Sequence, residues 1–199
     1  MSASVEKGEI VGGIVLAFGS AIAAFGDTLL AKTDNPALKR KGIEAVTYGS
    51  LIEGTGNFIQ TFSRLKANPN IIQIETIGAG VQGIGNIINT FGGFILLDDQ
   101  EIRGLQLDFI GDGVQAIGAS LEAIGALQSD YYYGSILAIG EAFQAYGAAI
   151  EAYGNVLLLC KQKEEGERIQ AFGSQLLFIG TVISVEALAW EFKIQEVTF

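Results

Sequence analysis

Glycine recurs every seventh residue along most of this chain. Residues 139–154 read IGEAFQAYGAAIEAYG, in which Gly140, Gly147 and Gly154 are one heptad apart. Seven residues are close to two turns of an α-helix, so the spacing predicts helix. Glycine costs a helix interior about 1 kcal/mol relative to alanine. Its repeated use therefore indicates positions at which neighbouring helix backbones come close together.

The heptad divides the 199 residues into six helical segments. We predict helices at 5–32, 36–66, 70–97, 100–128, 131–162 and 165–194. Short turn sequences separate them, so consecutive helices are expected to be antiparallel. The glycines expected at the helix contacts are Gly19, Gly26, Gly49, Gly56, Gly78, Gly85, Gly92, Gly111, Gly118, Gly125, Gly140, Gly147, Gly154, Gly173 and Gly180.

The sequence also repeats at a period longer than the heptad. Gly49, Gly111 and Gly173 are 62 residues apart, and the glycines assigned to turns, Gly104 and Gly166, keep that spacing. The spacing predicts three copies of one helical hairpin, which stack into a single domain of residues 1–199.

Each heptad separates bulky residues from polar ones. With glycine at position a, positions d and g hold large apolar side chains, b and e hold most polar ones, and c and f are mostly small. We therefore expect an apolar face, a solvated polar face and small residues on both flanks of each helix. The predicted apolar interface face comprises Phe25, Ile52, Phe62, Ile84, Phe91, Ile117, Ile124, Phe143, Tyr146, Tyr153 and Ile179.

The two small flanks lie about 190° apart across the apolar face at 100° per residue. A closed ring of six helices would place neighbours about 120° apart, so the pattern favours a nearly flat, all-α layer with one apolar face. Such a face is too large to remain in water. Three covers fit it: a second copy, folding of the six helices back on themselves, or a lipid or granule surface.

Composition argues against an enzyme and against a nucleic-acid partner. The chain has no histidine and a net charge of −10, whereas phosphate binding needs clustered bases. Its single cysteine, Cys160, is interpreted as a small apolar filler. Asp98, Asp99 and Glu101 lack the spacing of a calcium loop and are interpreted as helix caps. No catalytic residue, cofactor or metal ligand is predicted.

Two further motifs have structural interpretations. GAGVQG at 78–83 matches the dinucleotide fingerprint, but that motif functions at a strand-to-helix turn and here falls within a helical heptad. Tyr131, Tyr132 and Tyr133 fit a contact between subunits and packing under a helix end equally well.

Hydropathy leaves a membrane location as a weaker alternative. Residues 76–97 carry no charge, which suits a membrane span. The stretch contains Gln82 and Asn86, however, and the equivalent helix carries Glu141 and Glu151 at its centre, where acids would be costly in lipid.

The N-terminus does not resemble a secretory signal. Glu6 and Glu9 stand where such a signal would be basic. We therefore expect a cytoplasmic protein, with later release to a spore or cell-surface structure left open.

The heptads AIGASLEAIG and AYGAAIEAYG, with LAFGSAIAAFG and QGIGNIINTFG, resemble the uncharacterised glycine-heptad "repetitive proteins" of spore-forming Firmicutes. The resemblance covers nearly the whole chain and implies no activity, cofactor or catalytic residue.

The sequence predicts a structural protein that assembles with itself. The apolar face and the glycine edges would build a filament, tube, sheet or shell. The alternatives are an amphipathic coat on a lipid or storage-granule surface, and a pore-forming or membrane-associated helical bundle.

Overall fold

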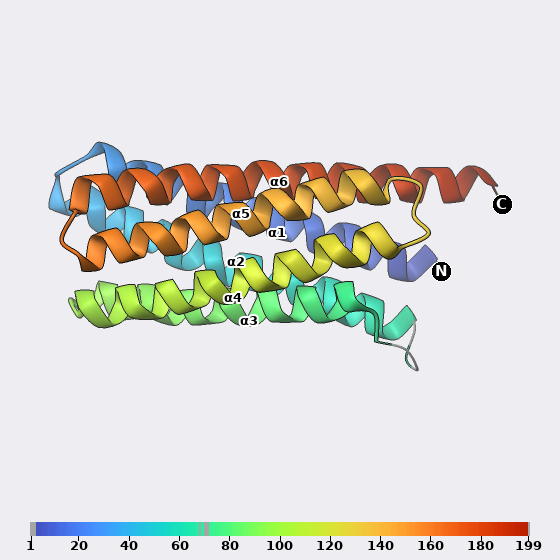
Figure 1. Ribbon diagram of the computed structural model, residues 1–199, viewed down its shortest axis with the longest axis horizontal. Helices are drawn as coiled ribbons and strands as arrows, with labels where there is room; N and C mark the ends of the chain where they lie inside the picture. The colour runs from blue at the N-terminus through green and yellow to red at the C-terminus, as the bar shows by residue number, and fades with distance from the viewer. Residues whose placement is uncertain (1–2, 68, 70–71, 199) are drawn as a thin grey trace.

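The computed structural model describes residues 3–67, 69 and 72–198, with side chains described for 7–67, 69 and 72–193. Within these residues the chain forms six helices and no strand, which confirms the all-α prediction. The helices are α1 (Ala3–Lys32), α2 (Pro36–Ala67), α3 (Ile74–Leu97), α4 (Glu101–Gln128), α5 (Gly134–Leu159) and α6 (Lys163–Thr198). Figure 1 shows them running side by side along the long axis of the molecule.

The helix ends follow from local signals. The Asn35 side chain accepts hydrogen bonds from the backbone N–H groups of Ala37 and Leu38 at 2.9 and 3.2 Å, and so caps the start of α2. Asp99 and Lys161 adopt left-handed backbone angles, with φ of 60° and 63°, just after α3 and α5. Such residues end a helix, so α5 stops at Leu159 rather than at the predicted 162.

The third predicted helix began at residue 70. Residues 70 and 71 lie outside the described part of the chain, and α3 begins at Ile74. Gly104 and Gly166, assigned to turns from the sequence, lie inside α4 and α6.

The six helices close into a ring. Each packs against the helices before and after it, and α1 also packs against α6. The prediction of a nearly flat layer is therefore wrong. Closure gives polar side chains partners across the ring, such as Arg64 on α2 with Glu122 on α4, whereas a flat layer would leave those side chains on an open surface.

The polarity of this ring is inverted relative to a soluble bundle. Its interior holds polar side chains such as Asn57 and Asn86, each 0% exposed, and Gln144, 1% exposed. Large apolar side chains lie outside, among them Phe25 and Phe62, which are 65% and 67% exposed. The predicted solvated polar face is therefore wrong, because that face is turned toward the axis of the ring.

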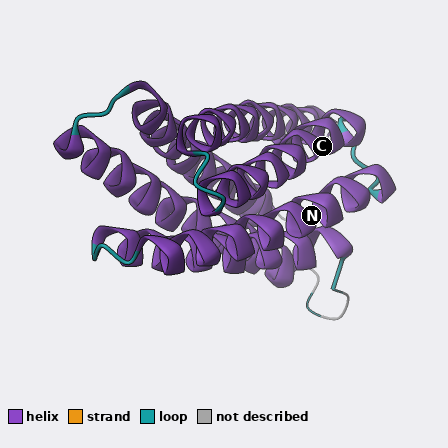
Figure 2. Ribbon diagram, turned by 60° about the vertical axis from the view of Figure 1, so that its left-hand side comes forward, coloured by secondary structure: helices purple, strands orange, loops and turns teal. Residues whose placement is uncertain are grey.

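The bundle has two unlike ends (Figures 1 and 2). We call one the hairpin end, which is formed by the α1–α2, α3–α4 and α5–α6 loops. The other is the terminal end, where the α2–α3 and α4–α5 loops lie beside the start of α1 and the end of α6.

Candidate functional site: a polar interior

Glycines bring the two helices of each hairpin into backbone contact. A Cβ atom added to Gly78 on α3 would lie 2.7 Å from the carbonyl oxygen of Gly118 on α4, a distance that no side chain tolerates. Equivalent pairs occur along all three hairpins: Gly12 with Gly56, Gly19 with Gly49, Gly26 with Gly42, Gly85 with Gly111, Gly92 with Gly104, Gly140 with Gly180, Gly147 with Gly173, and Gly154 with Gly166. Gly125, the remaining predicted glycine, faces Glu75 on α3.

Four members of these pairs were not predicted as contact glycines: Gly12, Gly42, Gly104 and Gly166. Each stands seven residues before a predicted glycine. The same heptad, extended one step toward the start of each helix, would have predicted all four.

Between hairpins the contacts are looser. On α2, a Cβ added to Gly54 would lie 3.2 Å from Asn86 Cβ on α3, and one at Gly83 would lie 3.0 Å from the Phe58 ring. The two flanks of a helix are therefore unequal, since backbone contact through glycine belongs to the flank inside the hairpin.

The predicted apolar interface face lies on the outside of the ring. Most of its side chains are exposed, whereas Ile52 and Phe143 are half-buried. The exposed members are Phe25, Phe62, Ile84, Phe91, Ile117, Ile124, Tyr146, Tyr153 and Ile179.

The middle of the ring contains a small cavity of about 40 Å³ whose walls are acidic. Asp27, Glu53, Asp108, Asp112 and Glu151 line it, together with amide and hydroxyl side chains, and none of the described residues in its walls is Lys or Arg. These carboxyl groups come from α1, α2, α4 and α5.

Asp112 is the best-bonded acid of this cavity. Its Oδ1 accepts a hydrogen bond from Asn89 Nδ2 at 2.6 Å, and its Oδ2 accepts one from Asn155 Nδ2 at 2.8 Å. Gln170 Nε2 donates in turn to Asn155 Oδ1 at 2.9 Å. This chain of hydrogen bonds links α3, α4, α5 and α6 across the interior.

A larger cavity of about 350 Å³, the vestibule, occupies the hairpin end. Its walls share Asp27, Asn89 and Asp108 with the central cavity, so the two spaces adjoin. Lys39 on α2 and Glu167 on α6 also line it and form an ion pair at 2.5 Å.

Among the described residues, Arg64, near the terminal end, is the only Lys or Arg that is fully buried. Its Nη1 donates to Glu122 Oε2 at 2.6 Å and to the carbonyl oxygen of Glu75 at 2.9 Å, and its Nε lies 3.4 Å from Glu9 Oε2. Glu122 also accepts a hydrogen bond from Gln82 at 2.7 Å. One guanidinium therefore joins α1, α2, α3 and α4.

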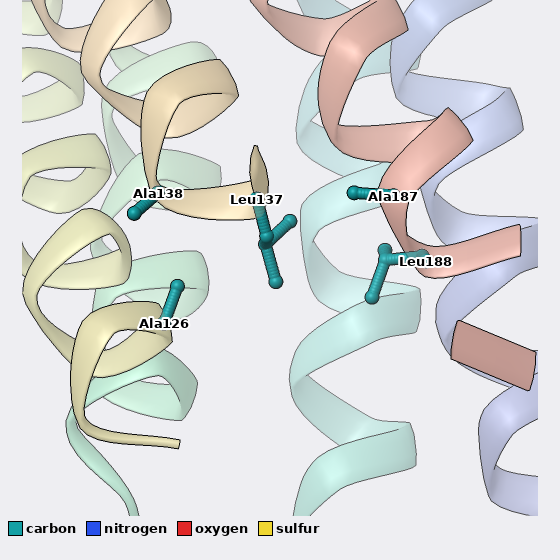
Figure 3. Packing of buried hydrophobic residues seen from close by; sticks show 5 residues of the cluster. All are labelled: Ala126, Leu137, Ala138, Ala187 and Leu188. Carbon is teal, nitrogen blue, oxygen red and sulfur yellow. The ribbon is translucent and has the colours of Figure 1, made fainter. Parts of the chain in front are cut away.

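An apolar cluster adjoins this ionic group at the terminal end. Figure 3 shows its buried members, Ala126, Leu137, Ala138, Ala187 and Leu188. Tyr131 and Tyr133 pack against it, which matches one of the two interpretations of the tyrosine run. Burial, with the nearby Glu9 carboxylate, raises the pKa of the Tyr131 phenol above its usual range. The interior is thus wide at the hairpin end and filled at the terminal end.

The remaining sequence candidates lie on α3 and at the hairpin end. GAGVQG lies inside α3, where its Gln82 is buried. Asp98, Asp99 and Glu101 are exposed at the hairpin end, and Asp99 and Glu101 also line the vestibule. Cys160 is exposed just after α5, so its interpretation as an apolar filler is wrong. Among the side chains that the structure describes, no group of three acids or thiols could hold a metal ion.

Three helices are long and apolar enough to cross a membrane. They are α1 over Lys7–Lys32, α3 over Ile74–Leu97 and α6 over Lys163–Lys193. The other three carry several buried acids and amides, such as Glu53 on α2, Glu122 on α4 and Glu141 on α5. Hydropathy averaged along a helix includes these inward-facing polar side chains. The average for α2, α4 and α5 therefore underestimates how apolar their outward faces are.

Comparison with known proteins yields one match. Residues 7–185 match a family described as a family of unknown function, DUF6944. No curated protein and no solved structure matches the chain.

Proposed function

The chain belongs to the DUF6944 family of unknown function, and we propose that it is an integral membrane protein, a ring of six helices with lipid outside and a polar interior. The observation that carries this proposal is the inverted polarity of the ring. Soluble proteins bury apolar side chains and pay a large cost for buried charges. Here Glu53, Asp112 and Glu122 are buried while Phe18, Phe62 and Phe91 are exposed.

The dimensions of the uncharged exterior support the proposal. On α6, the exposed charges nearest the middle are Arg168 and Glu186. These two residues are 18 positions apart, which corresponds to about 27 Å at 1.5 Å per residue and is close to the hydrocarbon thickness of about 30 Å. On α2, the half-buried Glu44 and the exposed Lys66 are separated by about 33 Å in the same way. The exposed side chains between these limits are uncharged, with Phe172 and Tyr48 among them.

Aromatic residues mark the edge of this surface. At the terminal end, Tyr132 is exposed and its ring contacts Tyr133, which in turn contacts Trp190. Trp and Tyr concentrate at membrane–water interfaces because their rings are apolar and their N–H and O–H groups are polar.

The glycine contacts also suit a bilayer. Lipid supplies no hydrophobic drive for helices to associate, so membrane helices rely on close packing through small residues. The backbone contact of Gly85 with Gly111 is packing of this kind. It would offset the helix-propensity cost of glycine through dispersion between backbones.

The central acids of α5, which made a membrane location less favourable from the sequence alone, do not face lipid. Glu141 is buried in the interior, where its carboxylate accepts a hydrogen bond from Gln144 at 2.9 Å. Ionisable groups within membrane proteins typically face the interior of the bundle and mark functional paths.

Self-assembly of a cytoplasmic protein stays a prediction, because further copies could cover the same apolar exterior. Fractionation of cells that express the protein distinguishes the membrane proposal from cytoplasmic self-assembly. The membrane proposal expects the protein to sediment with membranes, to resist alkaline carbonate and to enter solution as a small particle in mild detergent. Large regular particles in detergent-free buffer, with none in washed membranes, would contradict it and support assembly.

A second proposal rests on the two adjoining cavities: the interior admits small cations or protons from the hairpin end. The described residues in the walls of the central cavity include five acids and no Lys or Arg. Buried carboxyl groups without a base beside them either bind a proton or attract a cation. Because no three of the described acids are grouped so that they could hold a metal ion, these acids fit protons or transiently bound cations better than a fixed metal centre.

Proteoliposomes test this second proposal. Vesicles containing the protein should take up protons or K⁺ under an imposed potential, and Glu53→Gln combined with Asp112→Asn should reduce the rate at least tenfold. Glu186→Gln, which changes an exposed acid, is the matched control and should leave the rate unchanged. Equal rates in protein-containing and empty vesicles would contradict it.

A further inference from the structure

The basic residues are divided unequally between the two ends of the bundle. The chain has 12 Lys and Arg residues. Eight belong to the hairpin end: Lys32, Lys39, Arg40, Lys41, Arg103, Lys161, Lys163 and Arg168. The terminal end has Lys7, Lys66 and Lys193 together with the buried Arg64.

The internal loops show the bias most clearly. All three loops of the hairpin end have bases within or beside them, whereas the α4–α5 loop, SDYYY, has none. Short loops rich in Lys and Arg remain on the cytoplasmic side during membrane insertion. Acidic residues occur at both ends but contribute little to this rule.

We infer that the hairpin end faces the cytoplasm and the terminal end faces the opposite side of the membrane. This inference rests on the proposed membrane location and adds a direction to it. The vestibule opens at the hairpin end, so its acids draw protons or cations from the cytoplasm. The Arg64 ion-pair group and the apolar cluster that contains Leu137 then close the interior at the end that faces away from the cytoplasm.

The fold provides a built-in probe of this orientation. Cys160 is the one cysteine of the chain, and it is exposed at the hairpin end. Asp130 is exposed in the α4–α5 loop at the terminal end. A variant that combines Cys160→Ser with Asp130→Cys therefore moves the single thiol from one end to the other.

Labelling of intact cells with a membrane-impermeant charged maleimide tests the inference. We expect Cys160 to be labelled only after the cells are permeabilised, and the thiol of the Asp130→Cys variant to be labelled in intact cells. Gln128→Cys in the same Cys160→Ser background, also exposed near the terminal end, repeats the measurement should the first variant fold poorly.

Each other outcome overturns the inference in a distinguishable way. Labelling of Cys160 in intact cells, with protection of the terminal-end thiols, would show the reverse orientation. Partial labelling at both ends would show mixed orientation. Protection of all the thiols in intact cells, together with recovery of the protein in the soluble fraction, would instead overturn the membrane proposal on which the inference rests.

Discussion

Gly85 on α3 and Gly111 on α4 face each other in backbone contact. A Cβ added to Gly85 would lie 2.7 Å from the Gly111 carbonyl oxygen, and one added to Gly111 would lie 2.8 Å from that of Gly85. Neither position has room for a side chain unless the two helices separate. Equivalent pairs in the other hairpins make this contact the basic unit of the fold.

Gly111→Leu is therefore expected to destabilise the protein by at least about 3 kcal/mol, because the added side chain forces α3 and α4 apart. Gly113, two residues along the same helix, has no atom within 4 Å of its Cβ position. Gly113→Leu is the matched control and should gain up to about 1 kcal/mol from helix propensity. Unfolding of the purified protein by sodium dodecyl sulfate, followed by circular dichroism, measures both variants. Equal stabilities would contradict the contact.

Arg64→Met should destabilise the protein by about 3–5 kcal/mol, because it leaves Glu9 and Glu122 buried without their cation. Adding Glu122→Gln removes one of those charges and should restore more than half of the loss. The same unfolding assay compares the single and double variants. A loss below about 1 kcal/mol in the single variant would show that the ion-pair group does not hold the terminal end together.

Asp112→Leu should cost about 2–6 kcal/mol, because it leaves the buried amides of Asn89 and Asn155 each without an acceptor. Asp112→Asn keeps one acceptor oxygen, so its cost should be about half as large. If both variants lose the same stability, the two hydrogen bonds do not account for the role of this residue.

Ile117→Arg places a charge in the middle of the exposed apolar surface of α4, and Ile102→Arg places one at its hairpin end; both isoleucines are exposed, at 61% and 68%. In a bilayer the central charge should cost about 2.5–3.5 kcal/mol and the peripheral one little. Thermal unfolding in lipid nanodiscs measures the difference. An unchanged Ile117→Arg variant, with higher yield in detergent-free buffer, would indicate that water covers this surface.

The helices and the glycine positions were accessible from the sequence because both follow from one period. Gly140, Gly147 and Gly154 give helix, register and spacing together. The cap at Asn35 does not depend on the rest of the chain, and the hydrogen bonds of its side chain set the start of α2.

Whether the polar face of each helix points into the ring or outward could not be predicted from this period. An amphipathic pattern has the same period whether its apolar side faces a core or a solvent of lipid. Glu141 and Gln144 were therefore assigned to water, although they are buried inside the ring. Closure of the ring depends on contacts distant in sequence, such as Arg64 with Glu122, 58 residues apart, which no local period encodes.

Contact between the exposed apolar residues and lipid chains is the central claim, and tryptophan quenching tests it most directly. Trp190 is the only tryptophan, so Trp190→Phe with Ile117→Trp places a single fluorophore midway along α4. In vesicles of lipids brominated near the middle of their acyl chains, we predict strong quenching of this fluorophore and weaker quenching of native Trp190 at the terminal end. Equal fluorescence of the Ile117→Trp variant in brominated and ordinary vesicles would contradict the account.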